Sequence, residues 1–353
     1  MSTLIPVINW YKKNKRELPW RDTSNPYLIW LSEIILQQTK IEQGLPYYLK
    51  FAEKYPTIVD LANASTDEIM KLWQGLGYYS RAENMHRTAI KIKEEYGGKF
   101  PNIYNELITL KGIGSYTAAA IASIAFNEPK AVVDGNVFRF LSRLFAVDTP
   151  IDTSKGKKIF EEIAQELINP QNPGLHNQAI MEFGSQVCKP KQPLCATCIM
   201  QLQCKSLQLN KVNQFPVKQI KTKVKNRYLN YLFIETENKQ TYIRQRNDEG
   251  IWNKLYEFPV IELDIRTDNP IHIINSPTFK SLFKNKKIML DLVFQNKHQL
   301  SHQTIFANFW KVSGKNIKIA SNTDFTMISI NEINSFAIPR LLERFLNSIL
   351  PKV

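Results

Sequence analysis

The sequence predicts a multidomain protein in which an all-α domain precedes an α+β domain. Its 353 residues exceed what one domain usually holds. Apolar residues recur at helical spacing through the first half of the chain, and no convincing strand pattern comes before about residue 226. From Tyr228 the pattern changes to the period of two that is typical of strands.

The chain is strongly basic, with a formal net charge of +14. Lysine and arginine side chains that face phosphates release counterions, so this charge favours a polyanionic partner. The N-terminus, MSTLIPVINWYKKNKRELPW, lacks the long apolar core of a secretory signal. The longest apolar run, near Ala118 to Phe126, is too short to span a bilayer. We therefore expect a soluble, cytoplasmic protein that makes no contact with a membrane.

The stretch from Leu107 to Arg143 combines a glycine turn with an unusual carboxylate. Gly112 and Gly114 lie between apolar helical runs, where glycine lowers helix stability unless the chain turns tightly or approaches a ligand closely. Bare backbone N–H groups ahead of a helix bind phosphate, so both glycines are candidate phosphate contacts. Asp134 follows a short apolar run at the start of another predicted helix, where aspartate is most often an N-cap. That interpretation explains Asp134 alone but not the glycine turn upstream.

A second candidate lies in the helix predicted for Tyr27 to Ile41. Its apolar residues share one face, while Glu33 and Gln37 share another, beside Trp30. A glutamate in so apolar a helix either faces solvent, which is the commoner case, or is partly buried with a raised pKa. A raised pKa is what a general acid needs at neutral pH. The polar run 37–39 has groups able to reach bases or phosphates, or it is a hydrated helix end.

The cysteines are the most specific feature of the sequence. The chain has four, all in the segment CKPKQPLCATCIMQLQC: Cys188, Cys195, Cys198 and Cys204. Disulfides are improbable in the cytosol, so four thiolates so close together predict a shared metal site. Tetrahedral zinc and an iron–sulfur cluster are nearly balanced on spacing alone, and a metal-free loop is the least expected case.

A basic linker, residues 206–227, is predicted to separate domain 1–205 from domain 228–353. The stretch from Lys205 to Arg227 contains seven basic residues and no acidic one. Beyond it, YLNYLFIET and QTYIRQR predict one strand pair, and IMLDLVF with TIFANFWKV a second. Two short helices are predicted, Thr278 to Phe283 and Arg340 to Leu350. The loop KHQLSHQ between the second pair of strands is a candidate for reading a base.

Several motifs together resemble one enzyme family. WLSEIILQQT, GLGYYSRA, GIGSYTA and VDGNVFRFLSRLF, with the cysteine spacing, resemble the MutY adenine DNA glycosylases of the endonuclease III superfamily. The resemblance is dense over residues 1–205, and EGIWNKLYEFP resembles the family's Nudix-like C-terminal domain. It implies a glycosylase domain with a helix-hairpin-helix at LKGIGSYTAAAIA, and removal of adenine paired with 8-oxoguanine or guanine in double-stranded DNA. It also implies a [4Fe-4S] cluster held by the four cysteines, and a monomer that associates with the nucleoid when bound to DNA. No REUxEExG-type carboxylate cluster follows EGIWNKLYEFP, so we reject a metal-dependent hydrolase.

The resemblance also implies roles for individual residues. Glu33 would protonate the departing adenine, and Asp134 would stabilise the oxocarbenium-like sugar. Tyr116 and Asn136 match positions that line the same pocket. Seven further residues are expected to contact the adenine, to fill the gap that it leaves or to read the opposite base. They are Arg21, Gln38, Tyr78, Gln178, Leu300, Ser301 and His302.

Departures from the family and its superfamily bear on these roles. The loop that reads the lesion is typically Phe-Ser-His, so Leu300 departs from it while remaining apolar. Lys111 replaces a common proline, and Phe138 replaces a lysine that some members carry. Bifunctional members of the superfamily place a catalytic lysine where this chain has Tyr116, so no imine with the sugar is expected there.

Two other functional classes are weighed against this one. The first is a bifunctional glycosylase-lyase for oxidised pyrimidines, against which Tyr116 and the C-terminal domain argue. The second is a non-catalytic iron–sulfur DNA-binding protein, which would be expected to lack Glu33 or Asp134.

Overall fold

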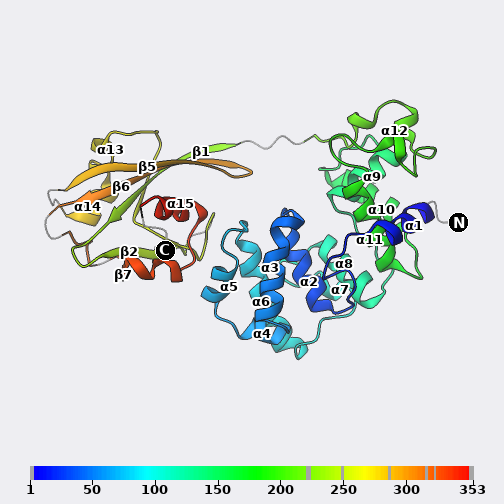
Figure 1. Ribbon diagram of the computed structural model, residues 1–353, viewed down its shortest axis with the longest axis horizontal. Coiled ribbons are helices and arrows are strands. Elements are labelled where there is room, and N and C mark those ends of the chain that lie inside the picture. The colour runs from blue at the N-terminus through cyan, green and yellow to red at the C-terminus, as the bar shows by residue number, and fades with distance from the viewer. Residues whose placement is uncertain are drawn as a thin grey trace. The chain divides into compact units, whose positions relative to one another are not determined.

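The computed structural model describes residues 4–219, 224–247, 250–284, 288–314, 317–321 and 323–349 (Figure 1). Its contacts divide the chain into two compact units. The first consists of Met1–Asn63 and Asn84–Lys221, and the second of Ala64–Glu83 and Thr222–Val353. The second unit thus takes one segment from within the range predicted for the helical domain. Part of the predicted basic linker, residues 220–223, lies outside the described residues.

Helices make up the first unit, as predicted. They are α1 (Ile5–Asn14), α2 (Pro26–Leu36), α3 (Ile41–Lys54), α4 (Ile58–Asn63), most of α6 (Ser80–Tyr96), α7 (Tyr104–Leu107), α8 (Ser115–Phe126), α9 (Gly135–Phe145), α10 (Ser154–Leu167), α11 (Pro173–Gln186) and α12 (Lys205–Gln208). Two 3₁₀ turns, η1 (Cys195–Thr197) and η2 (Val212–Gln214), lie near α12 in the sequence. Within the described ranges, none of the helices combines the length and apolarity that a bilayer crossing requires.

Helix α2 is shorter than the predicted helix Tyr27 to Ile41, which was wrong at its C-terminal end. The side chain of Asn25 caps its start by accepting a hydrogen bond from the backbone N–H of Tyr27. The helix ends at Leu36 because Gln38 takes a left-handed backbone conformation, with φ 53°. The polar run 37–39 is therefore a turn between α2 and α3.

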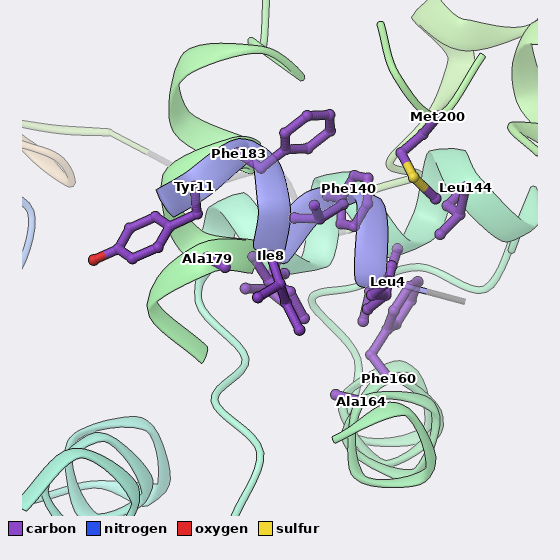
Figure 2. Close-up of a cluster of buried hydrophobic side chains, with 14 residues drawn as sticks. Leu4, Ile8, Tyr11, Phe140, Leu144, Phe160, Ala164, Ala179, Phe183 and Met200 are labelled. Carbon is purple, nitrogen blue, oxygen red and sulfur yellow. The ribbon is translucent and has the colours of Figure 1, made fainter. Parts of the chain in front are cut away.

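The core that positions the candidate site joins α1, α9, α10 and α11 (Figure 2). Buried aromatic rings from these helices pack edge to face, including Phe140 against Phe183 at 5.3 Å between ring centroids. Gly184 lets α11 approach α9 closely, since a Cβ atom there would lie 2.8 Å from the backbone oxygen of Asn136. Any larger residue at position 184 would push the two helices apart.

The second unit contains two sheets and short helices, which confirms the predicted α+β class. One sheet has the order β4-β1-β6-β5 and the other β3-β2-β7. The strands are β1 (Lys225–Ile234), β2 (Gln240–Gln245), β3 (Tyr256–Glu257), β4 (Val260–Leu263), β5 (Met289–Gln299), β6 (Gln303–Ser313) and β7 (Thr326–Ser329). The helices are α5 (Thr66–Leu72), α13 (Pro270–Ile274), α14 (Pro277–Phe283), η3 (Ile330–Ser335) and α15 (Arg340–Ile349).

One predicted strand pair is correct and the other is wrong. Strands β5 and β6 are antiparallel neighbours, as expected. Strands β1 and β2 are not paired: β1 lies parallel to β6 and antiparallel to β4, whereas β2 pairs with β3 and β7. The C-terminal part of β1 is buried without alternation, which is typical of a central strand that takes partners from distant parts of the chain.

Candidate active site

A cleft of about 740 Å³ in the first unit contains most of the predicted catalytic and base-contacting residues. Its walls come from the N-terminal stretch, α2, α8, the start of α9, and α11. Of the predicted site residues, the following line it: Arg21, Glu33, Tyr116, Asp134, Asn136 and Gln178. Residues from Arg21 to Gln178, a span of nearly half of the chain, therefore meet in one place.

Glu33 lies half-buried in the cleft, with the apolar side chains of Ile29 and Leu36 among the lining residues. The hydroxyl of Tyr116 donates a hydrogen bond to its Oε2 atom at 2.5 Å. Burial raises the pKa of Glu33 to about 7, although the hydrogen bond from Tyr116 opposes this. Of the two interpretations that the sequence left open, the half-buried position and the raised pKa agree with the partly buried one. Trp30, the expected apolar neighbour, is fully buried but is not among the lining residues.

Asp134 is both the N-cap of α9 and part of the cleft wall. Its Oδ1 atom accepts hydrogen bonds from the backbone N–H groups of Asn136 at 2.9 Å and Val137 at 2.7 Å. Its Oδ2 atom accepts one from the side-chain amide of Asn136 at 2.6 Å. Burial raises the pKa of Asp134 as well, and these hydrogen bonds oppose that rise. Because Asp134 has more donors than Glu33 and caps a helix N-terminus, its surroundings stabilise the carboxylate form more than those of Glu33 do.

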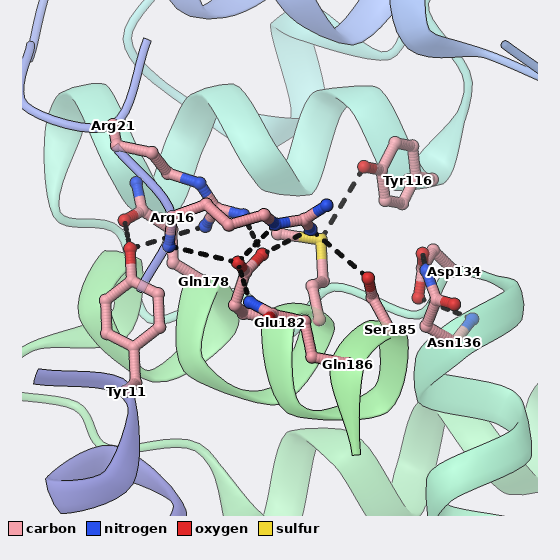
Figure 3. Close-up of polar contacts among 11 residues, drawn as sticks. Tyr11, Arg16, Arg21, Tyr116, Asp134, Asn136, Gln178, Glu182, Ser185 and Gln186 are labelled. Atoms are coloured by element: carbon pink, nitrogen blue, oxygen red, sulfur yellow. Dashed lines mark hydrogen bonds and ion pairs between the residues drawn. The ribbon is translucent and has the colours of Figure 1, made fainter. Parts of the chain in front are cut away.

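A polar network at the other side of the cleft includes residues that the sequence analysis missed (Figure 3). Glu182 has a side chain only 1% exposed and accepts hydrogen bonds from Arg16 at 2.6 Å and from Arg21 at 2.7 Å. Tyr11 donates to Gln178 at 2.7 Å. Only the spacing of Glu182, one turn after Gln178 on α11, could have indicated it from sequence.

Two arginines on α9 connect the cleft with the cysteine segment. Arg139 donates to the side-chain oxygen of Asn136 at 2.9 Å and to the backbone oxygens of Gly184 at 2.6 Å and Cys188 at 2.7 Å. One turn later, Arg143 donates to the Sγ atom of Cys188 at 3.5 Å. The residues that hold Asp134 and Asn136 in place are thus joined by hydrogen bonds to the start of the cysteine segment.

All four predicted metal ligands line a second pocket of the first unit: Cys188, Cys195, Cys198 and Cys204. The other lining residues are largely apolar, and Phe140 and Phe183 of the core are among them. Burial raises the pKa of the Cys188 thiol, while the neighbouring Arg143 lowers it. Among the described residues, no group of three or more His, Cys, Asp or Glu side chains is arranged around one metal-ion position.

The glycine turn has the predicted backbone features. Gly112 has φ 79°, in the left-handed region that glycine adopts most easily. Gly114 precedes α8 as its N-cap and supplies no side-chain hydrogen bond. The first-turn N–H groups of α8 therefore have no side-chain cap from this position.

Gln38 and Tyr78 lie outside the lining of the cleft but share a backbone feature. Both have a left-handed conformation, with φ 53° and 50°. For residues with a Cβ atom this conformation is strained, and such strain concentrates at functional sites. The side chain of Gln38 is exposed, and Tyr78 is 45% exposed.

The predicted base-reading loop is the tip of the β5–β6 hairpin in the second unit. Ser301 and His302 are exposed there, and Leu300 is half-buried. The backbone N–H of Leu300 donates to the oxygen of Gln303 at 2.8 Å, which closes the turn. Within the same unit, the hydroxyl groups of Ser301 and Tyr78 are hydrogen-bonded at 2.5 Å.

Comparisons with known proteins first define the class. Residues 31–170 match the model of the HhH-GPD superfamily of base excision DNA repair proteins, and residues 230–348 match a NUDIX domain. The structure is similar to a thermostable thymine-DNA glycosylase, at 29% identity and TM-score 0.54, over 57% of this chain and 94% of that one. An endonuclease III–DNA complex shares the fold at 22% identity and TM-score 0.51, over 59% of this chain and 94% of that one. Fold and cleft together are those of a base excision DNA glycosylase.

Relatives among the adenine DNA glycosylases then define the family. An adenine DNA glycosylase of Buchnera aphidicola subsp. Baizongia pistaciae is 35% identical over 361 residues, which cover 99% of this chain and 98% of that protein. The mouse adenine DNA glycosylase is 42% identical over 57% of this chain and 41% of its own length. This chain belongs to the MutY family of adenine DNA glycosylases.

Proposed function

We propose that this glycosylase removes adenine paired with 8-oxoguanine, or with guanine, from double-stranded DNA, using Glu33 and Asp134. The observation that carries the proposal is the unequal environment of the two carboxyl groups in one cleft. The pKa of Glu33 is raised by burial to about 7, so a large fraction is protonated at neutral pH. Asp134 accepts three hydrogen bonds that favour its anion.

In the proposed reaction, the adenosine nucleotide leaves the base stack and its base enters the cleft. The Glu33 carboxylic acid gives its proton to the base as the C–N glycosidic bond breaks, and the bonding electrons leave with the adenine. The sugar becomes oxocarbenium-like, and the Asp134 carboxylate stabilises the positive charge. Water then adds to the sugar carbon and gives its proton to the Glu33 carboxylate, which leaves an abasic site and restores the carboxylic acid.

We propose that the enzyme leaves the DNA strand intact. A lyase needs an amine that forms an imine with the sugar, and Tyr116 presents a phenol that is already hydrogen-bonded to Glu33. Phe138 stands where some family members carry a lysine, and it has no amine. Its ring packs against Phe160, with ring centroids 5.4 Å apart.

Binding of the duplex is assigned to groups outside the cleft. The uncapped start of α8, with Gly112 and Gly114, supports phosphate binding through backbone N–H groups. We assign Gln38 and Tyr78 to the gap that the adenine leaves. Their exposure and their left-handed backbones support this assignment, because the surrounding structure must hold each of them in a strained conformation.

Recognition of 8-oxoguanine is assigned to Leu300, Ser301 and His302. This base differs from guanine by a carbonyl at C8 and a proton on N7. A serine hydroxyl can accept from the N7–H group, and a backbone N–H can donate to the new carbonyl. The exposed position of Ser301 and His302 at a closed hairpin turn supports this role.

We propose that Cys188, Cys195, Cys198 and Cys204 hold a [4Fe-4S] cluster. The four side chains border one pocket, and hydrogen-bond donors already approach two sulfur atoms, from Arg143 and from the backbone of Met200. Such donors are typical around cluster thiolates, so these residues fit the group. When bound, the cluster would supply iron–thiolate bonds that tie the cysteine segment to the core. Iron and sulfide in purified protein would support the assignment, and stoichiometric zinc without iron would overturn it.

One experiment tests the proposed reaction. Purified protein is incubated with duplexes in which adenine is paired with 8-oxoguanine, guanine or thymine, and base release is scored with and without alkali. We expect release from the first two duplexes and strand breaks only after alkali. Strand cleavage without alkali would instead support a glycosylase-lyase. Binding without any base release would support the non-catalytic alternative.

A further inference from the structure

We infer that Tyr11 is a positioning residue that fixes the side-chain amide of Gln178, so that its NH₂ group is the part left to donate to the adenine. The inference rests on the proposed function, in which Gln178 contacts the extrahelical base. It adds a residue from the N-terminal helix to the specificity of the site.

The hydroxyl of Tyr11 in α1 and the amide of Gln178 in α11 meet in the buried part of the protein. Tyr11 is 2% exposed and Gln178 is 7% exposed. The hydroxyl donates to the Oε1 atom of Gln178 at 2.7 Å, and Figure 3 shows the two side chains pointing toward one another. Gln178 lines the cleft, whereas Tyr11 does not, so Tyr11 acts on a base only through another residue.

The direction of this hydrogen bond follows from a third residue. Arg21 donates to the Tyr11 oxygen at 3.3 Å, and a guanidinium group can only donate. The phenol oxygen is therefore an acceptor toward Arg21, and its own proton is free to point at Gln178. Burial raises the pKa of Tyr11, so this proton stays in place at neutral pH. With the amide turned the other way, the buried Tyr11 proton would have no acceptor among the described residues, so the oxygen of Gln178 faces Tyr11.

A buried carboxylate accepts the hydrogen bonds at the other end of the series that joins Gln178, Tyr11 and Arg21. Glu182, one turn beyond Gln178 on α11, accepts from Arg21 at 2.7 Å and from Arg16 at 2.6 Å. Arg21 thus donates both to this carboxylate and to Tyr11, and the ion pair with Glu182 holds its guanidinium group beside the Tyr11 oxygen. Among the described residues, no hydrogen bond is recorded for the Nε2 atom of Gln178, which leaves that donor for a ligand in the cleft.

An amide of fixed orientation discriminates between bases because its two ends are nearly equal in shape but opposite in polarity. Adenine presents ring nitrogens that accept hydrogen bonds and one amino group that donates. An NH₂ group from Gln178 matches a ring nitrogen, whereas a rotated amide would set two acceptors against each other. Holding the amide in one orientation therefore removes the unproductive state before the base arrives.

The test is a double-mutant cycle on single-turnover adenine release opposite 8-oxoguanine. Tyr11→Phe removes only the hydroxyl, and we expect about a tenfold slower release, the scale of one neutral hydrogen bond. The same substitution in a Gln178→Ala background should have no further effect, because Tyr11 acts through that amide. Equal losses in both backgrounds would show a merely structural role for Tyr11 and would overturn the inference. Unchanged release by Tyr11→Phe would also overturn it.

Tyr27→Phe is the matched control. The hydroxyl of Tyr27 is also buried and donates to the backbone oxygen of Tyr55 at 2.6 Å, but Tyr27 does not line the cleft. We expect this variant to lose stability to a similar extent and to release adenine at the wild-type rate. A Tyr27→Phe rate as slow as that of Tyr11→Phe would assign the effect to buried hydroxyls in general and contradict the inference.

A second measurement keeps the inference testable if Tyr11→Phe does not fold. Glu33→Gln protein is used to measure binding of duplexes in which the adenine carries CH in place of N1, N3 or N7. One of these replacements should weaken binding about tenfold, and adding Gln178→Ala should remove that difference. If no ring nitrogen is coupled to Gln178, the donor assignment is wrong. Failure of this inference can be told apart from failure of the proposed function. If the proposed function failed, wild-type protein would not release adenine, or Glu33→Gln would not slow the release.

Discussion

The proposed catalytic cleft and the β5–β6 hairpin differ in how their polar side chains are surrounded. In the cleft, Glu33 and Asp134 are held by protein donors in buried surroundings that raise the pKa of both. At the hairpin, Ser301 and His302 are exposed on a short closed turn. Excision of an extrahelical base needs a carboxylic acid that desolvation keeps protonated. Recognition of a base that stays in the duplex needs groups that exchange water for DNA, so damage to the two regions should have separable consequences.

The largest effect is expected in the cleft. Glu33→Gln and Asp134→Asn should each slow single-turnover adenine release by at least ~10²-fold, because they remove the proton donor and the anion that faces the sugar. DNA affinity, measured by filter binding, should stay close to that of the wild type. Near-wild-type rates in both variants would remove the basis for calling this cleft catalytic.

The buried acid should also be visible in stability. The pKa of Glu33 is raised by burial from 4.5 to about 7, so the folded protein binds its proton more tightly than the unfolded chain. Glu33 therefore does not lower the free energy of unfolding below about pH 4.5. It lowers this free energy progressively as the pH rises from about 4.5 to about 7. Glu33→Gln has no such loss and should be more stable than the wild type above pH 7, by up to ~3 kcal/mol. Denaturant unfolding at pH 5.5, 7 and 8 measures the difference, and a difference independent of pH would contradict the buried-acid assignment.

The next effect concerns the link between the cleft and the cysteine segment. Arg139→Gln removes the guanidinium that holds Asn136, Gly184 and Cys188, and adenine release should slow by roughly tenfold to a hundredfold through misplacement of the catalytic groups. Arg227→Gln is the control, since Arg227 forms a comparable two-point contact with Glu262 in the other unit. Equal slowing by both variants would mean that general destabilisation explains the result.

The smallest expected effect is on lesion choice. Ser301→Ala combined with His302→Ala should reduce the preference for 8-oxoguanine over guanine roughly tenfold, since an unpaired polar contact costs about 1–3 kcal/mol. Release of adenine opposite guanine should persist. Asn238→Ala, in another exposed turn of the same unit, should change neither rate. Equal loss on both duplexes would assign the hairpin to general DNA binding, and no change on either would make it an ordinary surface turn.

The sequence was sufficient to predict residues that lie in a local motif. It was insufficient for residues whose contacts are with distant parts of the chain. Glu33 and Asp134 could be singled out because each stands in an apolar helix or at a predicted helix start, and motif resemblance supplied Gln178. Glu182 was missed because its partners, Arg16 and Arg21, are more than 160 residues away along the chain. The same limit explains the wrong pairing of β1 and β2: neighbouring strands suggest a hairpin, but β1 pairs with β6, over 70 residues later.

The polar wall of the cleft depends on contact between α1 and α11, near the two ends of the first unit. Its hydrogen bonds close loops of more than 160 residues, so this wall has high contact order and cannot form until α11 has been synthesised. A nascent chain that ends after α9 already has both carboxyl groups but lacks Gln178 and Glu182. The wall to which we assign recognition of the base is thus completed later in translation than the two proposed catalytic carboxyl groups.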